Sequence, residues 1–191
     1  MIVYKQYKKI DSSFVKDKIK LFLEEDLPFG DKTTLGTITS TESILAEIQA
    51  GESLVFAGEQ IIPHCFDNNT TVDLMVKDGD QLDNGDLIGT IIGQPSTILS
   101  RERVMLNLIQ RLCGIATQAK AYANISTGTN VKILDTRKTT PGLRLFEKYA
   151  VTCGGCYNHR LNLSDGVLIK DNHLIAAKSV RNAVKNIVKI D

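Results

Sequence analysis

From residue 131 onward, short apolar runs alternate with segments of helical periodicity. The run VKILDT at 131–136 precedes a helical pattern at 140–151. The run GVLIKDNH at 166–173 precedes an amphipathic pattern at 175–189. This order of strand, helix, strand and helix indicates parallel strands joined by right-handed crossovers. It therefore predicts the α/β class, with functional groups at the carboxyl ends of the strands.

The N-terminal half follows a different pattern. The spacing of its first apolar residues predicts a helix over 12–26, followed by a polar, turn-rich loop over 25–34. From residue 44 to 92, short strand-like segments lie between glycines, with one helix expected around 59–66. Short strands with tight turns favour a small sheet-based module in this half.

The most strongly periodic segment is 101–125, where apolar side chains mark one face over five or six turns. Ser100 can cap this predicted helix, which places Arg103 near its start. A helix of this length suits a junction between domains. We therefore predict an N-terminal domain over 1–102 and a second domain over 103–191.

Composition and charge exclude several classes of protein. Hydrophobic residues make up 42% of the 191 residues and charged residues 24%, as in ordered globular chains. Lys and Arg number 23 against 22 Asp and Glu, so no global basic field favours nucleic acid. No apolar run approaches the roughly 20 residues of a membrane span, and the first residues lack a signal-peptide pattern. We expect a cytoplasmic protein without membrane or nucleic-acid partners.

The four cysteines predict no disulfide framework. Cys65 and Cys113 lie in partly apolar segments and are expected to be buried. Cys153 and Cys156 form a CxxC pair, but no second pair lies at the spacing of a zinc site. We therefore expect two thiols in a glycine-rich turn and no metal ligand from this chain.

The segment MVKDGDQLDNGDLIGTIIG at 75–93 resembles the hammerhead module of biotin- and lipoyl-carrier domains. A carrier needs a modifiable lysine at a hairpin tip between two apolar strands. Lys77 precedes a turn and is not flanked in that way. Scaffolding is the favoured role, and a non-catalytic carrier or binding module stays an alternative.

Cationic and hydroxyl side chains gather near the ends of the two predicted strands of the second half. Arginine offers a planar fork for a carboxylate or phosphate, lysine a point charge, and threonine a hydroxyl. Together they predict a site for a small polyanion, although a solvated charged edge would show the same composition. The set is Thr136, Arg137, Lys138, Thr139, Thr140, His159, Arg160, Lys170, Asp171 and His173.

Two longer motifs carry a family resemblance. DTRKTTPGLRLFEKYAVTCGGCYNHR at 135–160 and LIKDNH at 168–173 resemble quinolinate phosphoribosyltransferase, and the match extends to 24–34 and 100–117. The resemblance implies an N-terminal α/β sandwich with hammerhead-like strands, plus the first part of an incomplete α/β barrel. It also implies the reaction of quinolinate with 5-phosphoribosyl-1-pyrophosphate and Mg²⁺, which yields nicotinate mononucleotide, pyrophosphate and CO₂ for NAD biosynthesis.

The resemblance also implies residue roles. Lys138 and Lys170 match the catalytic lysines that meet the phosphates, and Arg103 matches an arginine supplied by a partner subunit. A homodimer or higher homo-oligomer is therefore implied. The substrate-binding set is Arg103, Thr136, Arg137, Lys138, His159, Arg160 and Lys170.

The chain departs from the family pattern in three respects. Tyr157 stands where the family usually has histidine, and Cys156 replaces a small residue. The family also continues beyond the position of Asp191 through further βα units that carry its Mg²⁺-binding carboxylates. We expect a fragment that is inactive by itself. A molybdenum-transport-associated relative and nicotinate phosphoribosyltransferase are the neighbouring alternatives.

Overall fold

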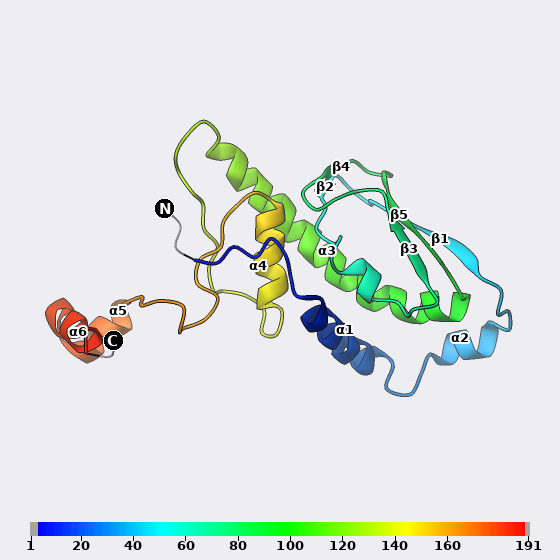
Figure 1. The fold of residues 1–191 in the computed structure, drawn as a ribbon, viewed down its shortest axis with the longest axis horizontal. Coiled ribbons are helices and arrows are strands. Elements are labelled where there is room, and N and C mark those ends of the chain that lie inside the picture. The colour runs from blue at the N-terminus through cyan, green and yellow to red at the C-terminus, as the bar shows by residue number, and fades with distance from the viewer. Residues whose placement is uncertain (1–3, 190–191) are drawn as a thin grey trace. The chain divides into compact units, whose positions relative to one another are not determined.

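The computed structural model describes residues 4–189, which divide into two compact units, 4–159 and 160–189. Figure 1 shows the elements of both. The first unit contains α1 (Ser12–Asp26), α2 (Lys32–Thr37), β1 (Ile44–Gln49), β2 (Leu54–Val55), the 3₁₀ helix η1 (Ile62–His64), β3 (Thr71–Leu74), β4 (Gln81–Leu82), β5 (Leu87–Gly93), α3 (Pro95–Ile125) and α4 (Arg144–Cys153). The second unit contains α5 (Asp171–Ala177) and α6 (Val180–Ile187).

The strands of the first unit form two antiparallel sheets. The larger has the order β1-β5-β3, and the smaller pairs β2 with β4. The central strand β5 is the most buried, because it has neighbours on both edges. Its Ile91 lies opposite Ala46 of β1 and Val72 of β3, and all three side chains belong to the core or pack against it.

Helix α3 packs against both the sheets and α4, so that one hydrophobic core extends along it (Figure 1). Its buried Leu112 and Ala116 join the same cluster as Phe56 and Phe146. The C-terminal end of α4 approaches α3 closely at Gly154, where a Cβ atom would lie 2.3 Å from a backbone oxygen of α3. This close contact fixes the segment that follows α4 against α3.

The N-terminal predictions are partly confirmed. Helix α1 spans the predicted residues, and Asp11 caps it by accepting a hydrogen bond from the amide of Phe14. The predicted loop over 25–34 already contains the first turn of α2. Asp31 caps α2 by accepting hydrogen bonds from the hydroxyl and amide of Thr34, which lower the pKa of the Asp31 carboxyl. The helix predicted around 59–66 is only the short η1.

The long helix begins earlier than predicted. It starts at Pro95, whose fixed φ and missing N–H suit a first turn. Ser100 therefore lies inside α3 and is not its cap, and Arg103 lies in the third turn. The predicted boundary at residue 102 falls within this continuous helix.

The two strands predicted after α3 do not form regular strands. At 131–136 the structure has one parallel bridge, Leu134 to Tyr157, with the Asp135 amide donating to the Tyr157 carbonyl at 2.9 Å. The segment 166–170 has no strand neighbour within residues 4–189, so ladder hydrogen bonds do not stabilise it. Helices and strands together still bear out the α/β class.

The helices after residue 140 begin and end at other residues than the sequence predicts. Helix α4 begins at Arg144, because Pro141 and Gly142 form a preceding turn in which Gly142 has φ +83°. The helix predicted over 175–189 is broken into α5 and α6. Lys178 adopts a left-handed conformation with φ 64°, and Ser179 then caps α6.

Candidate functional site

A buried polar cluster lies where residues 133–135 run beside residues 157–159. The Lys148 ammonium of α4 is 2.6 Å from Asp135 Oδ1, and the two side chains are only 1% and 7% exposed. The same oxygen accepts the His159 amide at 2.7 Å, and Asp135 Oδ2 accepts Asn158 Nδ2 at 2.8 Å. Lys148 also donates to the His159 carbonyl at 3.0 Å. One carboxylate therefore joins two segments to α4.

The N-terminal segment also contacts residues 158 and 159. The Tyr7 amide donates to Asn158 Oδ1 at 2.7 Å, and Gln6 exchanges two side-chain hydrogen bonds with the Asn158 backbone. The ring of Tyr4 lies 4.4 Å from the His159 ring, centroid to centroid. Asn158 is fully buried with its amide oxygen and nitrogen both bonded. His159 is therefore held through both its backbone and its ring.

A second ion pair anchors the far end of the 135–140 loop. Arg111 of α3 approaches Glu147 of α4 with an N–O distance of 2.7 Å. Glu147 Oε1 also accepts the Thr140 amide at 3.2 Å, and Arg111 donates to the Thr140 hydroxyl at 2.5 Å. The loop is thus fixed at both ends by carboxylates that already have cationic partners.

Between these anchors lie three predicted site residues. Thr136 is exposed, and its hydroxyl accepts the Lys138 amide at 3.0 Å. Lys138 is exposed and Arg137 is half-buried, and neither takes part in an ion pair with residues 4–189. The Nε atom of Arg137 is buried and lacks a hydrogen-bond partner within the described residues. A buried guanidinium N–H without an acceptor is costly unless a ligand supplies one.

Two further predicted residues belong to the second unit. Arg160 is 4% exposed, donates from Nη1 to the Gly166 carbonyl at 2.5 Å, and has a buried Nε without a partner in the described chain. Lys170 is exposed at the start of α5, and its amide donates to His173 Nδ1 at 3.0 Å. Arg103 is exposed on α3 of the first unit. The hydrogen bond to Asp135 thus places the His159 backbone beside the segment that precedes Thr136, and the site roles of all seven predicted residues stay predictions.

Sequence reasoning missed the residues that hold this arrangement. The sequence placed Asp135 near the end of a predicted strand and Asn158 within the family motif, but it indicated no role for either side chain. Lys148 lies among the buried residues of α4, between Glu147 and Tyr149. A buried lysine needs a buried partner, but the local sequence does not mark Lys148 as buried, because Arg144 and Thr152 on the same face of the helix are also polar.

The two unusual residues lie outside this polar cluster. The Tyr157 hydroxyl accepts from Lys132 Nζ at 3.0 Å, and the same ammonium lies 4.8 Å from the Tyr157 ring centroid. Cys156 is buried, its thiol donates to the Ala119 carbonyl, and burial raises its pKa. Neither side chain hydrogen-bonds to Asp135 or His159. Both replacements are therefore compatible with the arrangement around Asp135.

All four cysteines are free. Cys65 and Cys113 are buried as predicted, and burial raises their pKa values to about 12 and about 11. Burial also raises the pKa of Cys153, which ends α4. No group of three or more His, Cys, Asp or Glu side chains within residues 4–189 is arranged to hold a metal ion. None of the described helices has the length and apolarity of a membrane span.

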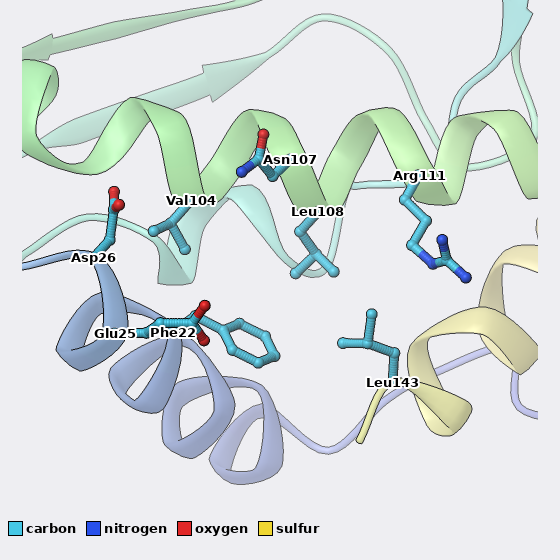
Figure 2. A pocket seen from close by; sticks show the side chains of 8 residues that line it. All are labelled: Phe22, Glu25, Asp26, Val104, Asn107, Leu108, Arg111 and Leu143. Carbon is cyan, nitrogen blue, oxygen red and sulfur yellow. The ribbon is translucent and has the colours of Figure 1, made fainter. Parts of the chain in front are cut away.

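A separate pocket of about 210 Å³ opens between α1 and α3. Figure 2 shows the carboxylates of Glu25 and Asp26 among the side chains that line it, together with the apolar Phe22 and Leu108. Arg111 points from α3 toward the start of α4, where it is already paired with Glu147. No ion pair within residues 4–189 neutralises these two carboxylates, which makes the pocket unsuitable for a dianion and favours the loop at 135–140 instead.

Comparison with known proteins supports one family. The model of the N-terminal domain of quinolinate phosphoribosyl transferase matches residues 31–113, and that of its C-terminal domain matches 115–190. The solved nicotinate-nucleotide pyrophosphorylase of Francisella tularensis is 32% identical with a TM-score of 0.90, over 98% of this chain and 68% of that one. The chain belongs to the quinolinate phosphoribosyltransferase family. The NadC structure from Streptococcus pyogenes agrees, with 40% identity, a TM-score of 0.89, and coverage of 95% and 67%.

Curated relatives carry the same names. A probable nicotinate-nucleotide pyrophosphorylase (carboxylating) of Bacillus subtilis is 47% identical over 174 residues, which are 90% of this chain and 60% of the relative. The enzyme of Mycobacterium leprae with that name is 40% identical, over 89% of this chain and 62% of its own length. The chain therefore spans about three fifths of these two relatives. The likeness to family structures supports the α/β fold described above.

Proposed function

We propose that this protein joins quinolinate to the phosphoribosyl group of 5-phosphoribosyl-1-pyrophosphate, with loss of CO₂. The observation that carries the proposal is the state of Arg137. Its Nε is buried without a partner among residues 4–189, while the adjacent carboxylates of Asp135 and Glu147 are already neutralised by Lys148 and Arg111. The loop therefore offers positive charge without a competing acid, as an anionic substrate requires.

The dicarboxylate explains the number of cations. Each carboxylate of quinolinate accepts charge-assisted hydrogen bonds, which are stronger than neutral ones. We assign this binding to Arg137, Arg160, Lys170 and His159, with the Thr136 hydroxyl beside them. The unpartnered Nε atoms of both arginines support the assignment. Nicotinate has a single carboxylate and would need fewer of these cations.

The chemical step needs alignment and charge stabilisation more than covalent help from the protein. The pyridine nitrogen forms a bond to C1 of the ribose as the bond from C1 to pyrophosphate breaks. The ring nitrogen is then cationic and stabilises the electron pair left at C2 when the 2-carboxylate leaves as CO₂, and a proton from water forms the C2–H bond of nicotinate mononucleotide. We assign Lys138 and Lys170 to the phosphate oxygens, and their exposed side chains support that role.

Mg²⁺ belongs to the proposal because pyrophosphate-bearing substrates bind it through their oxygens. Residues 4–189 present no cluster of three or more His, Cys, Asp or Glu side chains that could hold a metal ion. We assign no residue and no step to it.

A homodimer is also proposed, with Arg103 acting at the partner's site. The exposure of its side chain on α3 supports a role in a second subunit. A cytoplasmic location is proposed as well, and four free thiols support a reducing compartment.

Calorimetry tests the substrate on protein expressed from its complete reading frame. We expect quinolinate to bind at least tenfold more tightly than nicotinate, because nicotinate lacks one of the two carboxylates that the cations are proposed to bind. Equal affinity would favour nicotinate phosphoribosyltransferase. Binding of neither pyridine, together with an intact fold, would favour the molybdenum-transport-associated relative. A lipoyl or biotin adduct in the intact mass spectrum would favour a carrier module.

A further inference from the structure

We propose that Lys148 is a positioning residue of the substrate site, which acts through Asp135 by neutralising its charge and by holding the His159 backbone. This inference rests on the proposed function. The side chain belongs to α4 and does not itself lie among the predicted substrate contacts. Its ammonium has two partners, Asp135 Oδ1 at 2.6 Å and the His159 carbonyl at 3.0 Å.

Stability alone gives little reason for this ion pair. The side chains of Lys148 and Asp135 are only 1% and 7% exposed. Removing two such charges from water costs desolvation free energy that their mutual attraction often does not offset. Apolar replacements of similar volume are often neutral or stabilising. Helix α4 already contributes Phe146 and Tyr149 to the core without charge. A role beyond folding is therefore the more economical explanation of Lys148.

The first part of that role concerns charge. Asp135 lies two residues before Arg137 and three before Lys138, so it is the acid closest in sequence to both cations. Its carboxylate is needed, because it accepts the amides of His159 and Asn158. Without Lys148 it would be a buried, uncompensated negative charge beside a site for a dianion. Lys148 lets the carboxylate hold the backbone without repelling the substrate.

The second part concerns geometry. Lys148 binds the carbonyl of His159 while Asp135 binds its amide, so both polar groups of that residue are fixed. The ring of His159 can then face the substrate in one orientation. Removal of Lys148 leaves the His159 carbonyl without this donor and weakens the link between the 135–140 loop and the 157–159 segment.

The neighbouring residue provides a matched control. Tyr149 is fully buried on the same helix, and its hydroxyl donates to Asp78 in the N-terminal module rather than to Asp135. Tyr149→Phe removes one buried hydrogen bond from α4 without touching the candidate site. It is expected to lower the melting temperature while the dissociation constant of quinolinate stays within twofold of the parent value.

The experiment compares Lys148→Met, Asp135→Asn/Lys148→Met and Tyr149→Phe in protein expressed from its complete reading frame. Quinolinate binding is measured by calorimetry, and amide hydrogen exchange is followed at 135–140 and 157–159. Removing the partners that orient ligand-binding residues typically costs about 10- to 100-fold in metal sites. We expect the same range for Lys148→Met, and a loss of about three- to tenfold for the double variant, which lacks the repelling charge.

The outcomes separate the possible roles. A tenfold or greater loss in Lys148→Met, with faster exchange of the His159 amide, supports positioning. Affinity within twofold of the parent overturns it and leaves a purely structural role. If Lys148→Met does not fold, the double variant decides, since it removes both charges: a loss of about threefold or more with faster exchange of the His159 amide supports positioning, and affinity within twofold of the parent overturns it. A parent protein that binds no quinolinate refutes the proposed function instead, and exchange at His159 then still tests the structural tie.

Discussion

Two arginines of the first unit are predicted to respond in opposite ways to the same substitution. Arg137 has a buried Nε without a partner in the described chain, and Arg111 is paired with a 9% exposed Glu147. If Arg137 binds the ligand, Arg137→Met removes an unsatisfied buried N–H from the protein and also removes a hydrogen-bond donor from the ligand site. If Arg111 is mainly structural, Arg111→Met leaves Glu147 uncompensated and affects the ligand only indirectly, through the charge and the position of the 135–140 loop.

The magnitudes follow from these surroundings. Relief of an unsatisfied buried donor is worth about 1–3 kcal/mol, so Arg137→Met is expected to keep or raise the free energy of unfolding. Loss of its charged hydrogen bonds costs about 1.5–3 kcal/mol in binding, or roughly 10- to 100-fold in the dissociation constant of quinolinate. Breaking a buried pair costs about 3–5 kcal/mol. Because Arg111 is 43% exposed, Arg111→Met is expected to lose about 1–3 kcal/mol of stability.

The assay pairs urea unfolding, followed by helical circular dichroism because the chain has no tryptophan, with quinolinate calorimetry. Arg111→Met is expected to weaken quinolinate binding less than Arg137→Met does, because it removes no ligand contact but leaves the Glu147 charge beside the loop. If Arg137→Met unfolds more easily than the parent and binds quinolinate normally, Arg137 is a structural residue and the reasoning from its unpartnered Nε fails.

Three further predictions follow from the same structure. Mixing Arg103→Ala with Lys138→Ala subunits is expected to restore activity that each variant lacks, since a mixed dimer has one intact site; no recovery despite subunit exchange would place Arg103 outside the partner's site. Arg160→Ala is expected to weaken quinolinate binding about ten- to hundredfold and binding of the phosphoribosyl donor far less, as calorimetry would show. Gly154→Ala is expected to lose about 2–3 kcal/mol of stability in urea unfolding, because its Cβ would lie 2.3 Å from a backbone oxygen of α3; an unchanged midpoint would mean that this contact adjusts freely.

Local sequence signals predicted the helices better than the strands. Helix α1 was identified from its apolar spacing, because that spacing also determines which face is buried. The start of α3 was placed too late, because Pro95 was not recognised as its first turn. The runs at 131–136 and 166–173 have strand composition but no regular pairing, since strands depend on neighbours that a local pattern does not show.

The residues of the candidate site also differ in whether the sequence predicted them. Thr136, Arg137, Lys138 and His159 were predicted because their residue types favour anion binding. Asp135, Lys148 and Asn158 were missed because their role lies in contacts between residues that are distant along the chain. Asn158 binds Gln6, 152 positions away, and no local periodicity contains that information.

The product of the reaction tests the central claim most directly. Protein expressed from its complete reading frame is incubated with Mg²⁺, 5-phosphoribosyl-1-pyrophosphate and quinolinate labelled at the 2-carboxylate. Labelled CO₂ and nicotinate mononucleotide are measured together. We predict that they appear in equal amounts and that nicotinate does not replace quinolinate. Formation of the mononucleotide from nicotinate without release of label, or no product from a folded protein that binds both substrates, would contradict the proposed function.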